Sequence, residues 1–327
     1  MLNEKMVSLG MRRSVIREIF EYGKKRKAEI GEESVFDFSL GNPSVPTPAA
    51  VTAALKRIIK ETDPVKLHGY TSAQGDMAVR AKIAGSIEER FGFPADKDLI
   101  YMTCGAAASL TVTLNALINC GDEIIIPAPF FPEYRVFAEN AGARVVTVQC
   151  RKPDFQLDIK AIGSAVTEKT KAIIINSPNN PTGAVFSPDT IKALSDMLCK
   201  KQAEYGTNIY IIADEPYREL SYGAEVPYIP KYYANTVICY SYSKSLSLPG
   251  ERIGYIFIPE GAADCRKLYA AVCGAGRALG FVCAPSLMQY TVAECTDALP
   301  DVSAYKKNRD LLFGALTDYG YEAVPPD

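Results

Sequence analysis

Short apolar runs alternate with longer amphipathic stretches through the middle of this chain, from about residue 95 to residue 260. Runs of four or five apolar residues predict buried strands, and the stretches between several of them predict helices. Two such helices are expected at 106–117 and 188–204, the second with Ser187 as its N-cap and Pro188 in its first turn. The seven predicted strands span residues 99–103, 123–126, 144–148, 172–175, 209–213, 236–240 and 254–258.

Strands that are apolar along nearly their whole length need cover on both faces, so this pattern predicts an α/β fold. We expect a mostly parallel seven-stranded sheet between helices. An amphipathic helix is predicted at 11–30, and beyond residue 286 the pattern is helical again until Pro325-Pro326-Asp327. We therefore expect a large domain over 46–285 and a smaller α+β domain from 1–45 and 286–327, incomplete at its C-terminus.

Composition narrows the kind of protein. Apolar residues make up 48% of the 327 positions, enough for a sizeable core, and the net charge of −2 with interspersed signs gives no reason to expect nucleic acid or a membrane surface as partner. The N-terminal segment, with Arg12, Arg13 and Glu18, is too charged for a secretion signal. Nine scattered cysteines and a single histidine, His68, disfavour a disulfide framework and a metal site. We expect a cytoplasmic protein.

Small and polar residues follow the predicted strands, where open parallel sheets bind their ligands. Gly105 opens a helix whose first backbone N–H groups, at Ala106 and Ala107, could approach a phosphate. Asn180 lies in a rigid polar loop after strand 172–175. Asp214 ends the apolar strand 209–213, where a carboxylate is costly to bury without a cationic partner.

The most informative segment runs from Ser241 to Gly254. Lys244 follows the strand at 236–240 in a serine-rich turn, eight residues before Arg252. Such an amine can form a Schiff base with a carbonyl cofactor while Ser241 and Arg252 hold the phosphate of that cofactor.

Each feature alone also has an ordinary structural explanation. Gly105 could serve a tight turn, Asn180 a plain Asn/Pro/Gly turn, and Asp214 a helix cap. Tyr217 and Phe131 could be core residues, and an isolated lysine is most often solvated. Only the combination of these residues, and no single one of them, therefore indicates a cofactor site.

The whole set resembles the aminotransferases of class I and II, the aspartate aminotransferase superfamily with the fold-type-I architecture. The resemblance covers roughly residues 35 to 290, and its most specific parts are the Asn-Pro-Thr-Gly and lysine motifs. The matching motifs, in chain order, are Gly41-Asn-Pro43, Tyr70-Thr-Ser-Ala-Gln-Gly75, Gly105, Asn180-Pro-Thr-Gly183, Asp214-x-x-Tyr217, Lys244 and Arg252.

The resemblance implies pyridoxal 5′-phosphate (PLP) as cofactor. It makes Lys244 the Schiff-base lysine, Asp214 the partner of the pyridine nitrogen, and Asn180 and Tyr217 the contacts of the ring's phenolic oxygen. Phe131 falls where the family places an aromatic side chain against the ring. The phosphate ligands implied are Gly105, Ala106, Ser241 and Arg252. Ala107 and Ser243 are further implied cofactor contacts.

The implied reaction moves an amino group from an L-amino acid to a 2-oxo acid by a ping-pong mechanism through pyridoxamine phosphate. Tyr70 would reach the cofactor of a second subunit, which implies a homodimer with shared active sites, and Gly41 and Asn180 would approach the substrate. A PLP-dependent carbon–sulfur β-lyase, or another PLP lyase of the same fold, is the alternative. A PLP-sensing transcription regulator is disfavoured by the short N-terminal segment, and a nicotinamide dehydrogenase by the absence of G-x-G-x-x-G after any strand.

Two points depart from the family pattern. Ser109 replaces a common alanine, a mild change. The arginine that grips the substrate α-carboxylate has no counterpart before Asp327, from which we expect a truncated chain whose activity as written is in doubt. Arg277 lies near the position where dicarboxylate-selective relatives present a cation, but an ordinary surface arginine is the preferred explanation. The amino donor and the acceptor stay open.

Overall fold

The computed structural model describes residues 2–11 and 15–327. The chain forms two compact units, Met1–Ser44 and Val45–Asp327. The first unit holds the helices α1 (Glu4–Met11) and α2 (Val15–Ile30) and the 3-10 turn η1 (Glu32–Ser34). Residues 12–14 of the predicted helix 11–30, including Arg12 and Arg13, lie outside the described residues. The predicted grouping of 286–327 with the N-terminal segment stays a prediction.

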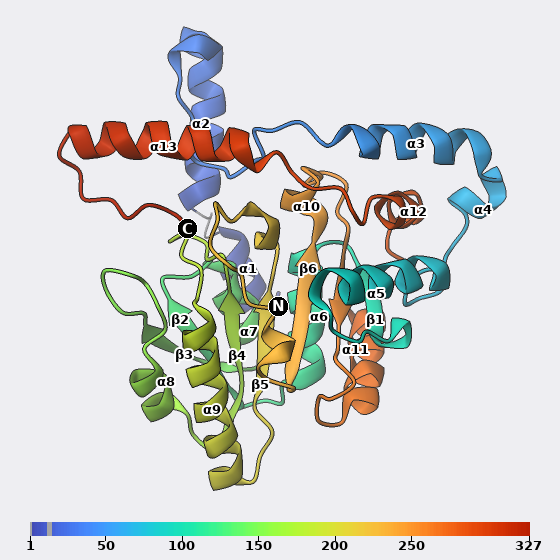
Figure 1. Ribbon diagram of the computed structural model, residues 1–327, viewed down its shortest axis with the longest axis vertical. Coiled ribbons are helices and arrows are strands. Elements are labelled where there is room, and N and C mark those ends of the chain that lie inside the picture. Colours follow the sequence, from blue (N-terminus) through green and yellow to red (C-terminus); the bar gives the residue numbers. More distant parts are fainter. Residues whose placement is uncertain (1, 12–14) are drawn as a thin grey trace. The chain divides into compact units, whose positions relative to one another are not determined.

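A single seven-stranded sheet organises the second unit (Figure 1). The strand order is β1-β7-β6-β5-β4-β2-β3; β7 runs antiparallel to both of its neighbours, and all other neighbouring pairs are parallel. The predicted mostly parallel sheet is therefore confirmed, and each strand begins and ends within two residues of its predicted position. The strands are β1 (Ile100–Thr103), β2 (Glu123–Ala128), β3 (Arg144–Gln149), β4 (Thr170–Asn176), β5 (Tyr210–Asp214), β6 (Thr236–Ser241) and β7 (Gly254–Phe257).

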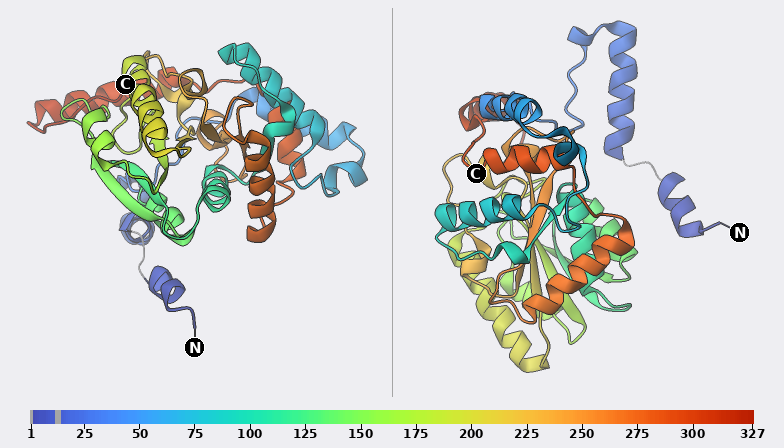
Figure 2. Two further views of the ribbon diagram at one scale, coloured as in Figure 1. Left: turned by 90° about the horizontal axis from the view of Figure 1, so that it is seen from below. Right: turned by 90° about the vertical axis from the view of Figure 1, so that its right-hand side faces the viewer.

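Helices cover both faces of this sheet (Figure 2). One face packs against α6 (Ala106–Leu117), α7 (Glu133–Asn140) and α11 (Cys265–Leu279). The helices whose buried residues join the core on the opposite face are α3 (Ala49–Glu61), α4 (Pro64–His68), α5 (Met77–Phe91), α8 (Ile159–Ala165), α9 (Pro188–Tyr205) and α12 (Ser286–Glu294). Two further helices are α10 (Tyr242–Ser245) and α13 (Val302–Asp318). Within the described residues, no helix is both long and apolar enough to cross a membrane.

Strand alternation assigns the polar strand ends to one face. In β4, β5 and β6 the side chains of Ile174, Ile212 and Cys239 belong to the core on the α6 side of the sheet. Residues two positions further along a strand project to the same face. The terminal residues of these three strands, Asn176, Asp214 and Ser241, therefore point toward α6 and α7.

Close backbone approach brings the start of α6 against β7. Gly105 has a φ of +89° and caps α6, and a Cβ added to Gly254 would lie 3.0 Å from the Gly105 Cα and even closer to the Tyr240 carbonyl. A side chain at residue 254 would thus separate the α6 N-terminus and β6 from β7.

We predict that Gly254→Ala lowers the free energy of unfolding by about 1–3 kcal/mol or more, because backbone atoms must move to admit the methyl group. Gly274→Ala is the matched control: Gly274 lies inside α11 with open space around its Cα, so alanine should stabilise the helix by about 0.5–1 kcal/mol. Urea denaturation of both variants measures the two effects, and equal stability of Gly254→Ala and the parent would contradict the first.

Candidate active site

Asp214, the last residue of β5, is a buried carboxyl group with only one of its oxygens bonded. Its side chain is 5% exposed, and the Tyr134 hydroxyl donates to Oδ2 at 2.5 Å. The other oxygen, Oδ1, is buried and has no hydrogen-bond partner among the described residues. Burial raises the pKa of Asp214 to about 7; the bond from Tyr134 opposes this shift and the nearby Glu215 adds to it. The site is therefore poised to receive a cationic N–H donor.

Asn176 connects the ends of β4 and β5. Its Nδ2 donates to the Asp214 carbonyl at 2.9 Å, and its Oδ1 accepts from the Asn180 backbone N–H at 2.7 Å. Asn180 in turn donates from Nδ2 to the Tyr217 hydroxyl at 3.2 Å. Burial raises the pKa of Tyr217 to about 12, so this hydroxyl stays protonated at neutral pH. Asn180 and Tyr217 together present an amide and a hydroxyl beside the Asp214 strand end.

A second group of side chains surrounds the start of α6. The Ser241 and Ser243 hydroxyls lie 2.8 Å apart, and Arg252 Nη1 donates to Ser243 Oγ at 3.4 Å. A Cβ on Gly105 would approach Arg252 Nη2 to 2.8 Å, so the absence of a side chain there lets the guanidinium reach the helix terminus. Ala106 and Ala107 are the first residues of α6, whose leading N–H groups have no acceptor within the helix. Hydroxyls, a guanidinium and helix N–H groups form a suitable cradle for an anion.

Lys244 lies in α10, directly after β6, and its side chain is half-buried. Burial and the positive charge of Arg252 lower the pKa of the Lys244 amine below its usual value. A larger fraction of this amine is therefore neutral, and so nucleophilic, than for a solvated lysine.

Three other predicted residues lie apart from these contacts or only border them. The half-buried Phe131 packs edge-on against Tyr134 with 5.6 Å between ring centroids, which places it beside the Asp214 pair. Tyr70 is 99% exposed and does not join the site of its own chain. Gly41 belongs to the unit Met1–Ser44, and its predicted role stays a prediction.

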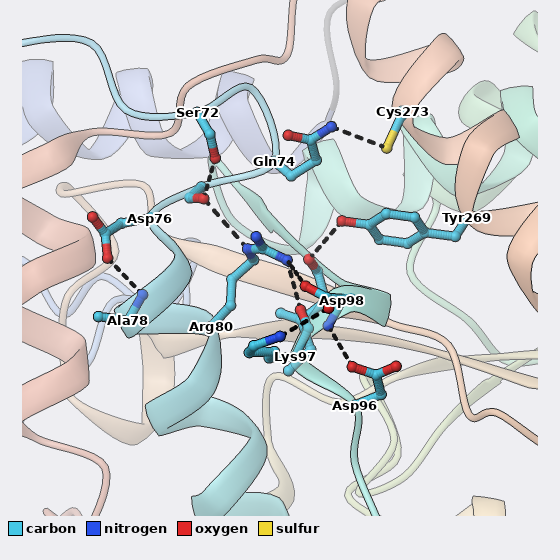
Figure 3. Close-up of polar contacts among 12 residues, drawn as sticks. Ser72, Gln74, Asp76, Ala78, Arg80, Asp96, Lys97, Asp98, Tyr269 and Cys273 are labelled. Atoms are coloured by element: carbon cyan, nitrogen blue, oxygen red, sulfur yellow. Dashed lines mark hydrogen bonds and ion pairs between the residues drawn. The ribbon is translucent and has the colours of Figure 1, made fainter.

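The loop that carries Tyr70 is held by buried polar contacts (Figure 3). Arg80 extends from α5 and donates from Nη1 to the Lys97 carbonyl at 2.7 Å and from Nε to the Gly75 carbonyl at 3.3 Å. Gln289 accepts from the Asp76 backbone N–H at 2.8 Å. The exposed tyrosine is thus presented on a fixed loop.

Two site residues were missed by the sequence interpretation, Tyr134 and Asn176. Asn176 had a usable signal, because it is the first polar residue after an apolar strand and occupies the same place as Asp214 in the neighbouring strand. Tyr134 had a weaker signal, its position in the first turn of the helix that follows β2.

The exposed Arg277, in the last turn of α11, has no assigned role. Ser109, the mild departure from the family pattern, is buried and bonded to Thr103 Oγ1 at 2.7 Å.

The fold and the strand-end site define an α/β enzyme of the aspartate aminotransferase architecture. The aspartate aminotransferase of Thermus thermophilus solved with maleate superposes with a TM-score of 0.84 at 24% identity, over 100% of this chain and 82% of the other. At this identity the likeness shows the fold alone.

The chain belongs to the aminotransferase class I and II family, which it matches over residues 33–327. A crystal structure of an aminotransferase from Eubacterium rectale is 55% identical, with a TM-score of 0.97, and covers 100% of this chain and 82% of that one. A probable aspartate aminotransferase of Methanocaldococcus jannaschii is 29% identical over 96% of this chain and 80% of its own length. A probable N-acetyl-LL-diaminopimelate aminotransferase of Bacillus subtilis is 30% identical over 90% and 72%, respectively. The predicted family and enzyme class are confirmed, and membership implies PLP.

The raised pKa of Asp214 makes the stability of the cofactor-free protein depend on pH. The folded state holds this proton up to about pH 7, whereas the unfolded chain releases it near pH 4. Protonation therefore stabilises the fold at low pH, and this contribution is lost as pH rises toward 7. We predict that Asp214→Asn, which cannot ionise, gains stability relative to the parent by about 3 kcal/mol between pH 5 and pH 8.

Chemical denaturation of the cofactor-free proteins across this range measures the difference. Asp196→Asn, at an exposed position in α9, should show none of this pH dependence. A constant offset between Asp214→Asn and the parent at all pH values would contradict the assignment.

Proposed function

We propose that this protein uses PLP to transfer the amino group of an L-amino acid to a 2-oxo acid. The observation that carries the proposal is the buried Asp214 carboxyl with one unpartnered oxygen, at the same sheet edge as a lysine of lowered pKa. A buried carboxylate is expensive unless a positive partner satisfies it, and a protonated pyridine nitrogen is such a partner.

The donor set fits the other parts of the cofactor as well. Asn180 and Tyr217 offer two donors for a phenolic oxygen, and Phe131 offers a flat apolar face near Asp214. Ser241, Ser243, Arg252, Gly105, Ala106 and Ala107 would hold the phosphate. A divalent anion in this cradle would replace the hydrogen bonds that the serines now make with each other.

PLP supplies an aldehyde for an amine and a ring that withdraws electrons from the substrate α-carbon. Asp214 would keep the ring nitrogen protonated, since its carboxylate is stabilised by that positive charge. Tyr217 and Asn180 would orient the ring by their hydrogen bonds. Lys244 would hold the cofactor through its aldehyde carbon, and its Nζ would serve as the base that accepts and returns the substrate α-proton.

The substrate pair is open to a direct assay. The similar proteins above carry names for aspartate and for N-acetyl-LL-diaminopimelate as donors, so a donor panel with 2-oxoglutarate should include dicarboxylic, basic and aromatic amino acids. New glutamate with stoichiometric 2-oxo acid supports transamination. Pyruvate and ammonia from cystathionine without an acceptor would instead support the carbon–sulfur lyase.

Lys244→Ala should abolish the visible absorbance of protein-bound PLP and lower turnover by more than the ~10²–10⁴-fold that a positioned acid–base group contributes, because this amine both binds the cofactor and moves the proton. Lys160→Ala, at an exposed position in α8, is the control and should change neither signal. Retention of the absorbance band in Lys244→Ala would remove this lysine from the mechanism.

A cytoplasmic homodimer with shared sites completes the proposal. The support for a dimer is Tyr70, whose side chain is almost fully exposed on a hydrogen-bonded loop and so is not packed against its own chain. All nine cysteines are free thiols, as expected in a reducing compartment.

Shared sites predict complementation between two damaged chains. A heterodimer of Lys244→Ala with Tyr70→Ala would contain one site with an intact lysine from one chain and an intact tyrosine from the other. Co-expression with two affinity tags should therefore recover up to about half of the parent activity per dimer, although each homodimer is impaired. If Tyr70 acts only within its own chain, the purified heterodimer should retain at most about half of the activity of the Tyr70→Ala homodimer, because its other site lacks the lysine.

A further inference from the structure

A second buried carboxylate lies behind the proposed site. Glu219 follows Tyr217 in the 3-10 turn η3 (Arg218–Leu220), and its side chain is only 4% exposed. Arg90, at the end of α5, donates to Glu219 Oε1 at 2.6 Å. Burying a carboxylate costs free energy even when it is paired, so we expect Glu219 to have a structural role that offsets this cost.

The reason lies in the second partner of that carboxylate. The Tyr240 hydroxyl donates to the same Glu219 Oε1 at 3.0 Å and is hydrogen-bonded to Ser245 Oγ, also at 3.0 Å. Tyr240 is in β6, one residue before Ser241, and Ser245 immediately follows Lys244. One hydroxyl therefore joins the turn that carries Tyr217 to the turn that carries Lys244.

This link lies on the opposite face of the sheet from the cofactor contacts. Tyr240 belongs with Ile238 to the core packed by α5, whereas Ser241 and Asp214 face α6. It stacks with Tyr255 at 5.0 Å between ring centroids and meets Tyr242 edge-on at 5.1 Å, so its ring has little freedom. The packed ring holds the Tyr240 hydroxyl in place. Through its hydrogen bonds to Glu219 and Ser245, this hydroxyl restrains the turn after Tyr217 and the turn that carries Lys244.

The segment bearing Tyr217 is fixed on its other side too. Glu215 pairs with Arg218 at 2.5 Å, and both side chains are about 95% buried. The Arg218 guanidinium lies over the rings of Phe91 and Tyr228, at 5.2 and 5.4 Å from their centroids. Residues 215–219 are thus held by two ion pairs, of which only the Glu219 pair extends to the lysine turn.

We propose that Tyr240 and Glu219 are positioning residues that set the orientation of the Lys244 amine relative to Tyr217. Neither touches the cofactor site, and both act through hydrogen bonds to the two turns. The inference rests on the proposed PLP function, which makes the relative placement of Lys244 and Tyr217 matter. A shift of about 1 Å in such a pair is enough to cost ~10²-fold in rate.

The test uses Tyr240→Phe, which removes the bridging hydroxyl and leaves the ring stack and the Arg90–Glu219 pair in place. We expect kcat to fall ~10-fold or more with a smaller change in KM, and the pH midpoint of the bound-cofactor absorbance to move by at least about 0.5. Ser245→Ala, which removes the other end of the link, should shift the midpoint in the same direction. The double variant should shift it no further than Tyr240→Phe alone, because one connection is lost in all three.

Tyr233→Phe is the matched control for a merely structural role. Tyr233 is also buried in the core, and its hydroxyl donates to the Ile209 carbonyl at 2.7 Å, at the other end of the sheet. The Tyr233→Phe variant should lose about as much stability as Tyr240→Phe, but its absorbance midpoint should not move. Tyr228→Phe adds a second control, since the buried Tyr228 hydroxyl has no hydrogen-bond partner among the described residues. Its loss should neither lower the stability nor move the absorbance midpoint.

The outcomes separate this inference from the function on which it rests. A parent protein that shows no PLP absorbance overturns the proposed function itself. A parent that binds PLP, with Tyr240→Phe unchanged in midpoint and in kcat, overturns the positioning role and leaves the function standing. A midpoint shift that Tyr233→Phe reproduces would likewise show that loss of a buried hydroxyl anywhere in the core is sufficient, and would overturn the role.

Discussion

The in-register parallel pairing of β4, β5 and β6 is the constraint on which the site depends. Asn176 pairs with Asp214, and Asp214 with Cys239, so the three strands end at nearly the same level. Side chains alternate along a strand, and a slip by one residue in β5 would turn Asp214 into the α9 side of the core. The same slip would move Ile212 out of the core on the α6 side and Ile211 and Ala213 into it, so both closely packed cores would have to rearrange. The hydrophobic core and the polar site are therefore specified together.

The same pairing buries Asp214 with one carboxyl oxygen that has no hydrogen-bond partner among the described residues. Burial disfavours the charge and raises the pKa of Asp214 to about 7, although the hydrogen bond from Tyr134 to one oxygen opposes this shift. A cationic donor bound to the second oxygen would lower the free energy cost of burying the carboxylate. The free energy gained in this way would add to the affinity for the donor. Binding of the proposed cofactor and stability of the fold are linked through this residue.

The sequence predicted the strands well because each is a short apolar run between helical stretches, and the polar residues at strand ends follow from how parallel sheets bind ligands. It could not reveal the partners of those residues. Tyr134 is 80 positions from Asp214, and Arg90 is 129 positions from Glu219, so no local pattern connects them. Tyr240 was assigned to a buried strand with no reason to suspect a bonded hydroxyl. The predicted role of Tyr70 involves a second copy of the chain, so no contact within one chain can reveal it.

The two sides of the lysine turn differ in what a ligand does to them. On the α6 side, Ser241, Ser243 and Arg252 bond one another in the protein alone and would turn to a bound phosphate. On the α5 side, Tyr240 is hydrogen-bonded to Glu219 and Ser245, on the face of the sheet away from the cradle, so these bonds would not have to change when a ligand binds. A turn held only from the first side would change its restraints each time the cofactor bound. In the proposed positioning role, the buried Glu219 would hold the amine in the same place with and without the cofactor, which would offset the cost of burying this carboxylate.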